Sequence, residues 1–209
     1  MLGILDYGVG NLFSLRSSFS ALGVESIVSA DTHALGACSA LVLPGVGAFE
    51  KAAGLLSDSG LAEFALRRVE AGVPLLGICL GMQLLFEKSY EYGEHAGLGL
   101  IPGAVRPIRD IIPAGLKIPH IGWNSLIFPN DHPKSALFSE VKPGECVYFV
   151  HSYYADTDAA YISATAEYGA PLTAAVERGG VYGCQFHPEK SGPVGLRILR
   201  AFCRLGGVL

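Results

Sequence analysis

The first 78 residues alternate short apolar runs with segments of helical periodicity, and this alternation constrains the fold more than any other feature of the sequence. The runs predict strands over residues 2–5, 26–29, 40–43 and 74–78. The longer segments predict helices over residues 12–22 and 61–71. Strands without polar alternation that are separated by helices are typical of a parallel sheet covered by helices on both faces.

The second half of the chain has a different pattern. Residues 103–125 and 146–181 carry short alternating segments with proline and glycine turns, which predict strands joined as hairpins at an edge of the sheet. A last helix is predicted over residues 194–205, where Leu199 and Phe202 are spaced to pack on the sheet. We therefore expect one domain over the whole chain, with a three-layer α/β fold whose open sheet is mixed and mostly parallel.

Charge and composition narrow the classes of partner and compartment. The 15 Lys and Arg residues against 19 Asp and Glu residues leave a net charge of −4 without a basic run, which gives no electrostatic support for a nucleic-acid surface. Residues 1–5 lack a basic segment and Asp6 follows them, so we expect no signal peptide and a cytoplasmic location. The most apolar stretch, residues 73–86, is too short to span a membrane. Five scattered cysteines without a Cys-x-x-Cys pair argue against a disulfide framework or a structural zinc site.

A candidate nucleophile lies in Gly77-Ile78-Cys79-Leu80-Gly81, which follows a predicted strand and precedes a predicted helical stretch over residues 82–88. This context matches the nucleophile elbow Gly-x-Ser-x-Gly, with cysteine in place of serine. Small residues on either side allow a sharp turn that exposes the thiol, and the helix N-terminus behind it would stabilise a thiolate. The N–H of Leu80 would face a developing oxyanion. The alternative is that Cys79 is one more buried thiol.

A base for this thiol is offered by Cys184-Gln185-Phe186-His187-Pro188-Glu189, at the end of another apolar strand. Gln185 and His187 share one face of that strand, and Glu189 can turn back to hydrogen-bond the imidazole, as the acid of a triad does. Taken alone, the segment is more typical of an ordinary surface histidine beside a loop acid, and only the elbow reverses that balance.

Three further segments are candidates for binding. Pro44-Gly45-Val46-Gly47 ends a predicted strand, and its N–H groups could complete an oxyanion hole, although a simple turn explains the glycines as well. The stretch Tyr148-Phe149-Val150-His151-Ser152-Tyr153-Tyr154 alternates like a strand with packed aromatics. Pro119-His120-Ile121-Gly122-Trp123-Asn124 contains the only tryptophan, which could anchor a partner or merely fill a gap.

Together these segments resemble the class I, or triad, glutamine amidotransferases, and among them the glutaminase subunits of imidazole glycerol phosphate synthases. The resemblance runs nearly end to end, and it implies the flavodoxin-like fold of that family. Besides the segments quoted above, it is carried by Asp6-Tyr7-Gly8-Val9-Gly10-Asn11-Leu12, Met82-Gln83-Leu84-Leu85 and Lys190-Ser191. No catalytic position departs from the family pattern.

The resemblance implies a reaction and assigns residues to it. Cys79 would attack the side-chain amide of glutamine, His187 would protonate the leaving ammonia with Glu189 as its orienting acid, and water would hydrolyse the glutamyl thioester. The remaining residues that it implies are oxyanion-hole N–H groups at Val46 and Leu80, and contacts to the α-amino and α-carboxylate groups of glutamine from Gly47, Gln83, Ser152 and Tyr153. No cofactor and no metal is expected.

The resemblance also implies a partner. The family pairs this subunit with a (β/α)8-barrel cyclase in a heterodimer, and ammonia travels through the barrel to a phosphoribulosyl intermediate, giving imidazole glycerol phosphate and an aminoimidazole carboxamide ribotide in histidine biosynthesis. We expect Asn11, His120, Trp123 and Tyr148 to face the cyclase. We also expect little activity from the chain alone, because the loop would present the N–H of Val46 correctly only when the cyclase is loaded.

Other functions are compatible with the same residues. Another triad glutaminase, such as the anthranilate, guanylate or pyridoxal phosphate synthase subunits, would share Cys79, His187 and Glu189 but pair with a different synthase. A cysteine peptidase or related hydrolase on a similar sheet would show no specificity for glutamine. A non-enzymatic nucleotide-binding or scaffold module would use the elbow only as a tight turn.

Overall fold

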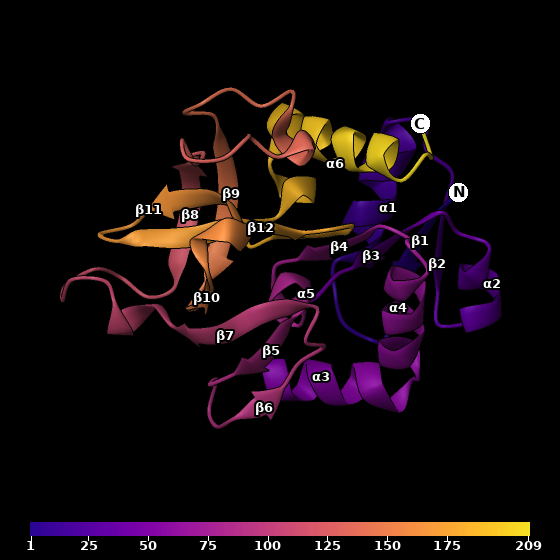
Figure 1. The fold of residues 1–209 in the computed structure, drawn as a ribbon, viewed down its shortest axis with the longest axis horizontal. Helices are drawn as coiled ribbons and strands as arrows, with labels where there is room; N and C mark the ends of the chain where they lie inside the picture. Colours follow the sequence, from indigo (N-terminus) through magenta and orange to yellow (C-terminus); the bar gives the residue numbers. More distant parts are fainter.

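A computed structural model describes residues 1–209 and places a seven-stranded sheet between two layers of helices, with two smaller sheets beside it (Figure 1). The strands of the large sheet are β1 (Leu2–Leu5), β2 (Ser26–Ser29), β3 (Ala40–Leu43), β4 (Leu75–Ile78), β11 (Ile162–Glu167), β12 (Pro171–Arg178) and β13 (Val181–Cys184). Their order is β11-β12-β13-β4-β3-β1-β2. β2, β1, β3, β4 and β13 are parallel to one another, and β12 and β11 extend the sheet in antiparallel fashion.

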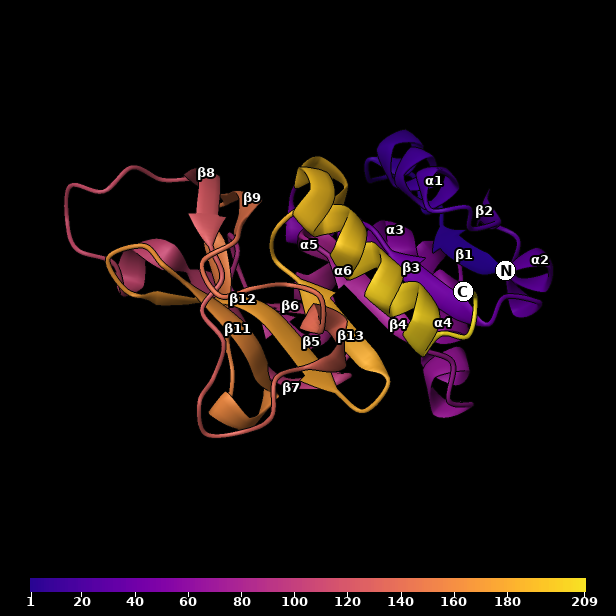
Figure 2. The same cartoon turned by 90° about the horizontal axis from the view of Figure 1, so that it is seen from above.

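Helices cover both faces of this sheet, as Figures 1 and 2 show. The face that carries α1 (Leu12–Ala21) and α6 (Gly192–Leu205) lies opposite the face that carries α3 (Phe49–Asp58) and α4 (Leu61–Glu70). The shorter helices are α2 (Thr32–Gly36), α5 (Leu80–Gln83) and the 3-10 helices η1 (Ile108–Asp110), η2 (Ala136–Phe138), η3 (Ala159–Tyr161) and η4 (Pro188–Lys190). None of the helices combines the length and the apolar character that a membrane span requires.

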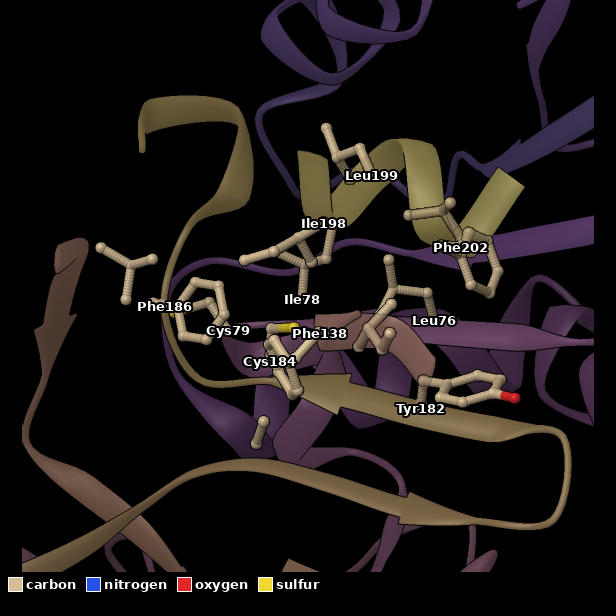
Figure 3. Close-up of a cluster of buried hydrophobic side chains, with 14 of the residues drawn as sticks. Leu76, Ile78, Cys79, Phe138, Tyr182, Cys184, Phe186, Ile198, Leu199 and Phe202 are labelled. Atoms are coloured by element: carbon tan, nitrogen blue, oxygen red, sulfur yellow. The ribbon is translucent and has the colours of Figure 1, made fainter. Parts of the chain in front are cut away.

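Two buried clusters hold the layers together, because successive residues of a strand point to opposite faces. On one face, Leu76 and Ile78 of β4 pack in the same cluster as Leu199 and Phe202 of α6 (Figure 3). Burial of each such side chain stabilises the fold by roughly 1.5–3 kcal/mol. The cluster on the other face includes Leu41, Leu43, Phe49, Leu56, Phe64 and Leu75. Cys79 belongs to the first cluster, so the candidate nucleophile is anchored in the core.

The two smaller sheets are built from segments that lie between β4 and β11 in the sequence. One has the order β10-β7-β5-β6 and contains β5 (Phe86–Ser89), β6 (His95–Ala96), β7 (Ile101–Pro107) and β10 (Tyr153–Asp156). The other is the antiparallel pair β8 (His120–Ser125) and β9 (Cys146–His151). This pair projects beside α6 at the end of the molecule where β11 and β12 lie (Figure 1).

The predicted fold class, α/β with a mixed and mostly parallel sheet between helices, is confirmed, and the strands β1 to β4 and the helices α1, α4 and α6 lie within two residues of their predicted bounds. The predicted helix over residues 82–88 is wrong, because β5 follows directly after the single turn of α5. The carbonyls of Leu84 and Leu85 accept hydrogen bonds from the N–H groups of Leu98 and Ile101, at 2.8 and 3.0 Å, so the helix does not continue.

The predicted hairpins at one sheet edge are only partly correct. β11 and β12 do extend the large sheet beyond β13, but β7, β8, β9 and β10 belong to the two smaller sheets. The helices α2 and α3 have no counterpart among the predictions.

Candidate active site

Three neighbouring parallel strands end at the same edge of the large sheet and position the predicted site. β3, β4 and β13 are adjacent, and their register pairs Leu43 with Gly77 and Cys184 with Ile78. The loop of residues 44–47 follows β3, Cys79 follows β4, and the run of residues 185–189 follows β13. Ligands of open α/β sheets bind beyond the carboxyl ends of such strands. The sheet therefore brings together segments that are far apart in the chain.

Cys79 occupies a strained turn between β4 and α5. Its dihedral angles are φ 56° and ψ −111°, a conformation that residues other than glycine rarely adopt. Its N–H donates to the Cys184 carbonyl at 2.7 Å. A Cβ at Gly81 would lie 1.9 Å from the carbonyl oxygen of Leu43, and one at Gly77 would lie 2.6 Å from the carbonyl oxygen of Gly81. Close packing of the elbow against β3 therefore requires glycine on both sides of Cys79.

The groups around the Cys79 sulfur differ from those predicted. Because α5 is a single turn, it supplies little of the helix dipole that was expected to stabilise a thiolate. Polar support comes from the segment after β13 instead, where Gln185 Nε2 lies 3.9 Å from Cys79 Sγ. Gln185 is fully buried and its side-chain oxygen accepts from Gln83 Nε2 at 3.0 Å.

His187 and Glu189 form a buried pair beside this sulfur. The distance from His187 Nδ1 to Glu189 Oε1 is 2.8 Å, and the two side chains are 3% and 1% exposed. Burial disfavours the imidazolium, but hydrogen bonding and charge interaction with Cys79 and Glu189 outweigh it and raise the pKa of His187 to about 9. Since Nδ1 is occupied by the carboxylate, Nε2 is the nitrogen available to exchange protons at the sulfur.

The backbone around His187 is held by strand β9. The His187 N–H donates to the Tyr148 carbonyl at 2.9 Å. The Tyr148 N–H in turn donates to Ser191 Oγ at 3.0 Å, and that hydroxyl donates to the His187 carbonyl at 2.6 Å. Hydrogen bonds at both ends of residues 187–191 therefore fix the segment of His187 to strand β9.

The glycine-rich loop after β3 lies across from this pair. Tyr7, at the end of β1, donates its hydroxyl to the Pro44 carbonyl at 2.5 Å. Burial first, and then the charge of Cys79, raise the pKa of Tyr7 far above its usual value, so the hydroxyl stays a donor. Gly47 has φ +96°, which suits glycine, and the N–H of Val46 donates to no group of the protein. The loop thus leaves the N–H groups of Val46 and Gly47 free at the mouth of the site.

One cavity of about 310 Å3 joins these parts. Its lining residues are Val46, Gly47, Cys79, Leu80, Gln83, Glu91, Pro119, Val150, His151, Ser152, Tyr153 and His187. This set contains every predicted catalytic, oxyanion-hole and glutamine-contacting residue except Glu189, which lies behind His187. No group of three or more His, Cys, Asp or Glu side chains is arranged to hold a metal ion.

Four residues of the site were missed as candidates by the sequence analysis. Tyr7 and Gln185 fall inside the quoted segments. For Gln185 the available signal was that it shares a strand face with His187. His151 was interpreted as one of several packed strand residues, yet it lines the cavity. Glu91, in a polar loop after β5, accepts the N–H of Phe49 at 2.5 Å and presents a carboxylate to the same cavity, and no local pattern indicates it.

The candidates for a partner surface divide into exposed and buried residues. Trp123 is 58% exposed, and its ring lies 6.1 Å from that of the half-buried Tyr148. Asn11 is half-buried at the start of α1, beside Phe13, which is 82% exposed. His120 is 3% exposed, so its side chain lies beneath the surface of β8, and its place at a partner surface stays a prediction. Residues alternate across a strand, and His120 takes the inner side of β8 while Ile121 and Trp123 take the outer side.

Comparison with known proteins places this geometry in context. Residues 3–204 match the family model described as glutamine amidotransferase class-I. "Imidazole glycerol phosphate synthase subunit HisH" of Streptococcus sanguinis is 48% identical over 202 residues, which cover 97% of this chain and 95% of the relative. The protein of the same name from Geobacillus sp. is 47% identical over 208 residues, which cover 98% and 97% of the two chains.

Solved structures show the same fold at lower sequence identity. A crystal structure of a glutamine amidotransferase superposes with a TM-score of 0.76 at 22% identity and covers 99% of this chain and 98% of the other. A chain of PurLQS from Thermotoga maritima gives a TM-score of 0.71 at 20% identity, with 97% of each chain covered.

Proposed function

The chain belongs to the class I glutamine amidotransferase family, and on that premise we propose that it is the glutaminase subunit of an imidazole glycerol phosphate synthase. The observation that carries the proposal is the meeting of Cys79, His187 and Gln83 at one cavity, with Glu189 hydrogen-bonded behind His187. Relatives that share nearly half of the sequence over almost the full length, and that bear the name of this synthase subunit, support it. They favour it over other triad glutaminases and over hydrolases on a similar sheet.

In the proposed reaction Cys79 Sγ attacks the side-chain amide carbon of glutamine. The C–N bond breaks as His187 passes its Nε2 proton to the departing nitrogen, which leaves as ammonia, and a glutamyl thioester remains on Cys79. His187, now neutral, takes a proton from water, and the resulting hydroxide attacks the thioester to release glutamate. Glu189 holds the imidazole in the tautomer that both steps need.

Two N–H groups would stabilise the oxyanion that develops in each step. These are the N–H of Val46, which has no partner in the protein, and the N–H of Leu80 directly after the nucleophile. The α-ammonium and α-carboxylate of glutamine would be held by Gly47, Gln83, Ser152 and Tyr153. The carboxylate of Glu91 lies in the same cavity and is suited to the α-ammonium, which would select an amino acid over a peptide.

The partner in the proposal is a (β/α)8-barrel cyclase subunit, bound as a heterodimer in the cytoplasm. The relatives' name describes one subunit of a synthase, which supports the existence of a partner. The proposed contacts to this cyclase are Asn11, Trp123 and Tyr148, which are exposed or half-buried. Ile121, which is 60% exposed, adds apolar area beside Trp123. The cyclase would receive the ammonia directly, and the whole chain would act as one glutaminase domain.

The test is glutamate release from glutamine by the purified chain, alone and with a cyclase subunit that carries its phosphorylated ligand. We expect release to be low for the chain alone and to rise at least about 10-fold in the loaded complex, because the Val46 N–H must be oriented. Release that is equal in both conditions would contradict the dependence on the partner. Peptide hydrolysis without glutamine hydrolysis would favour the hydrolase alternative.

Loss of the Tyr7 hydroxyl is expected to slow the reaction without weakening glutamine binding. Tyr7→Phe deletes the donor to the Pro44 carbonyl and frees the loop that carries Val46. We expect kcat in the loaded complex to fall by about 5- to 10-fold, since the affected N–H acts mainly in the transition state. Steady-state kinetics on glutamine would show this with KM nearly constant. An unchanged kcat would mean that the loop is held without Tyr7.

A further inference from the structure

A buried series of hydrogen bonds connects strand β8 to the wall of the glutamine cavity. Asn124 Nδ2 lies 3.2 Å from His120 Nε2, and His120 Nδ1 lies 3.0 Å from His151 Nε2. His151 Nδ1 lies 2.7 Å from the carbonyl oxygen of Tyr153. His151 and Tyr153 both line the cavity, whereas Asn124 and His120 do not. The series therefore begins outside the site and ends in it.

The hydrogen-bond partners at the two ends of this series determine which ring nitrogen of each histidine carries a proton. The Asn124 amide is oriented by its neighbours, because Nδ2 donates to the Glu167 carbonyl at 2.8 Å and Oδ1 accepts the N–H of Ser125 at 2.8 Å. Nδ2 is thus a donor, so His120 Nε2 must accept and His120 must carry its proton on Nδ1. His151 Nε2 must then accept as well, which leaves the proton of His151 on Nδ1, facing a carbonyl.

The surroundings keep both histidines neutral and in place. His120 is stacked between the rings of Phe149 and Tyr168, with centroid distances of 4.9 and 4.3 Å. Burial lowers the pKa of His120. Burial also lowers the pKa of His151 to about 4; the hydrogen bond to the Tyr153 carbonyl opposes this shift, and the charges of His120 and His187 add to it. If either imidazole were protonated, its Nε2 would become a donor and would face the donor of the preceding residue in the series.

The carbonyl at the inner end also meets a predicted substrate contact. Gln83 Nε2 approaches the Tyr153 carbonyl at 3.4 Å, so this one oxygen lies between Gln83 and His151. At the other end, the side chains of Ile121 and Trp123 point outward from β8, whereas His120 is buried on its inner side. The same short strand thus contacts the proposed partner surface with one face and the cavity wall with the other.

We infer that His151 and His120 are positioning residues, which hold the Tyr153 carbonyl and with it the wall of residues 150–153 in the conformation that binds glutamine. The inference rests on the proposed function of the site. It concerns residues that would not take part in bond making, since neither ring can give or take a proton without breaking the series. Loss of either histidine should weaken glutamine binding in the ground state and the transition state alike.

The first test changes His151 in the loaded complex. His151→Leu removes the donor to the Tyr153 carbonyl at similar volume, and we expect KM for glutamine to rise by about 10-fold with kcat changed less than about 3-fold. His151→Asn is the matched control, because its amide N–H can occupy the position of Nδ1. We expect the Asn variant to recover most of the wild-type KM.

The second test changes His120, which lies outside the cavity. His120→Leu should raise KM in the same way, and His120→Asn, which keeps a donor at the position of Nδ1, should recover it. Circular dichroism and binding to the cyclase subunit would establish that each variant is folded. Wild-type KM in both folded Leu variants, or Asn variants no better than Leu variants, would overturn the inference. Absence of glutamate release from the wild-type complex would overturn the proposed function itself.

Discussion

Replacement of Cys79 by alanine is expected to lower glutamate release in the loaded complex by at least about 10³-fold, because no other group can form the thioester. Cys79 is the one cysteine at the cavity, and the four others are outside it. Alanine fits the strained elbow as well as cysteine does, since the strain lies in the backbone angles and in the glycines on either side. Release would be measured as glutamate formed per active complex.

The same variant offers its own control. When an ammonium salt replaces glutamine, the Cys79→Ala complex should form imidazole glycerol phosphate at the rate of the wild-type complex given the same salt, because in the proposed reaction the cyclase consumes ammonia from either source. Retained ammonia-dependent synthesis shows that the cyclase is intact, while circular dichroism and binding to the cyclase subunit show that the variant folds and docks. Glutamate release within about 10-fold of wild type would exclude Cys79 as the nucleophile.

Glu189→Gln is expected to lower kcat by about 10²-fold or more and to move the alkaline limb of the pH profile to lower pH. Glutamine can still accept from His187 Nδ1, so the substitution removes the charge and retains most of the packing. The carboxylate is one of the groups that raise the pKa of His187 to about 9. Without it the imidazolium is less stable, and the proton needed by the departing ammonia is lost at a lower pH.

The measurement is kcat and kcat/KM of the loaded complex over about pH 6 to 10. In the wild-type complex, activity should fall as the pH rises through about 9, where His187 loses its proton. Glu189→Asp is a useful second variant, because it keeps the charge but shortens the reach. If Glu189→Gln left the alkaline limb in place, or moved it to higher pH, the charge of Glu189 would have no part in holding the proton on His187.

The parallel half of the fold could be predicted because its signals are local. Residues 2–5, 40–43 and 75–78 are short apolar runs buried on both faces, and no competing pattern overlaps them. The stretch after the elbow could not be predicted in the same way. Leu84 and Leu85 fit a helix by their neighbours, but distant N–H groups take their carbonyls and turn the chain into β5.

The candidate site shows the same division between local and distant signals. The elbow around Cys79 and the segment of His187 and Glu189 have short motifs with a chemical reason, so the sequence was sufficient to propose them. Glu91 and His151 have no such motif. Glu91 reaches the cavity through a loop that caps α3, and His151 gains its place from strand pairing with His120.

The elbow lies in the centre of the large sheet, and different parts of the molecule are therefore expected to open locally at different rates. β4 and β13 are hydrogen-bonded on both sides, and the Cys79 N–H donates to the Cys184 carbonyl, so exposure of the Cys79 backbone requires the centre of the sheet to come apart. The ribbon of β8 and β9 is only two strands wide, which is marginal by itself. The protein thus places its nucleophile on its slowest-opening element and its partner surface on a faster one. Docking of a partner is then able to reshape the ribbon while the nucleophile keeps its place, and the ribbon reaches the base through the hydrogen bond from the His187 N–H to the Tyr148 carbonyl.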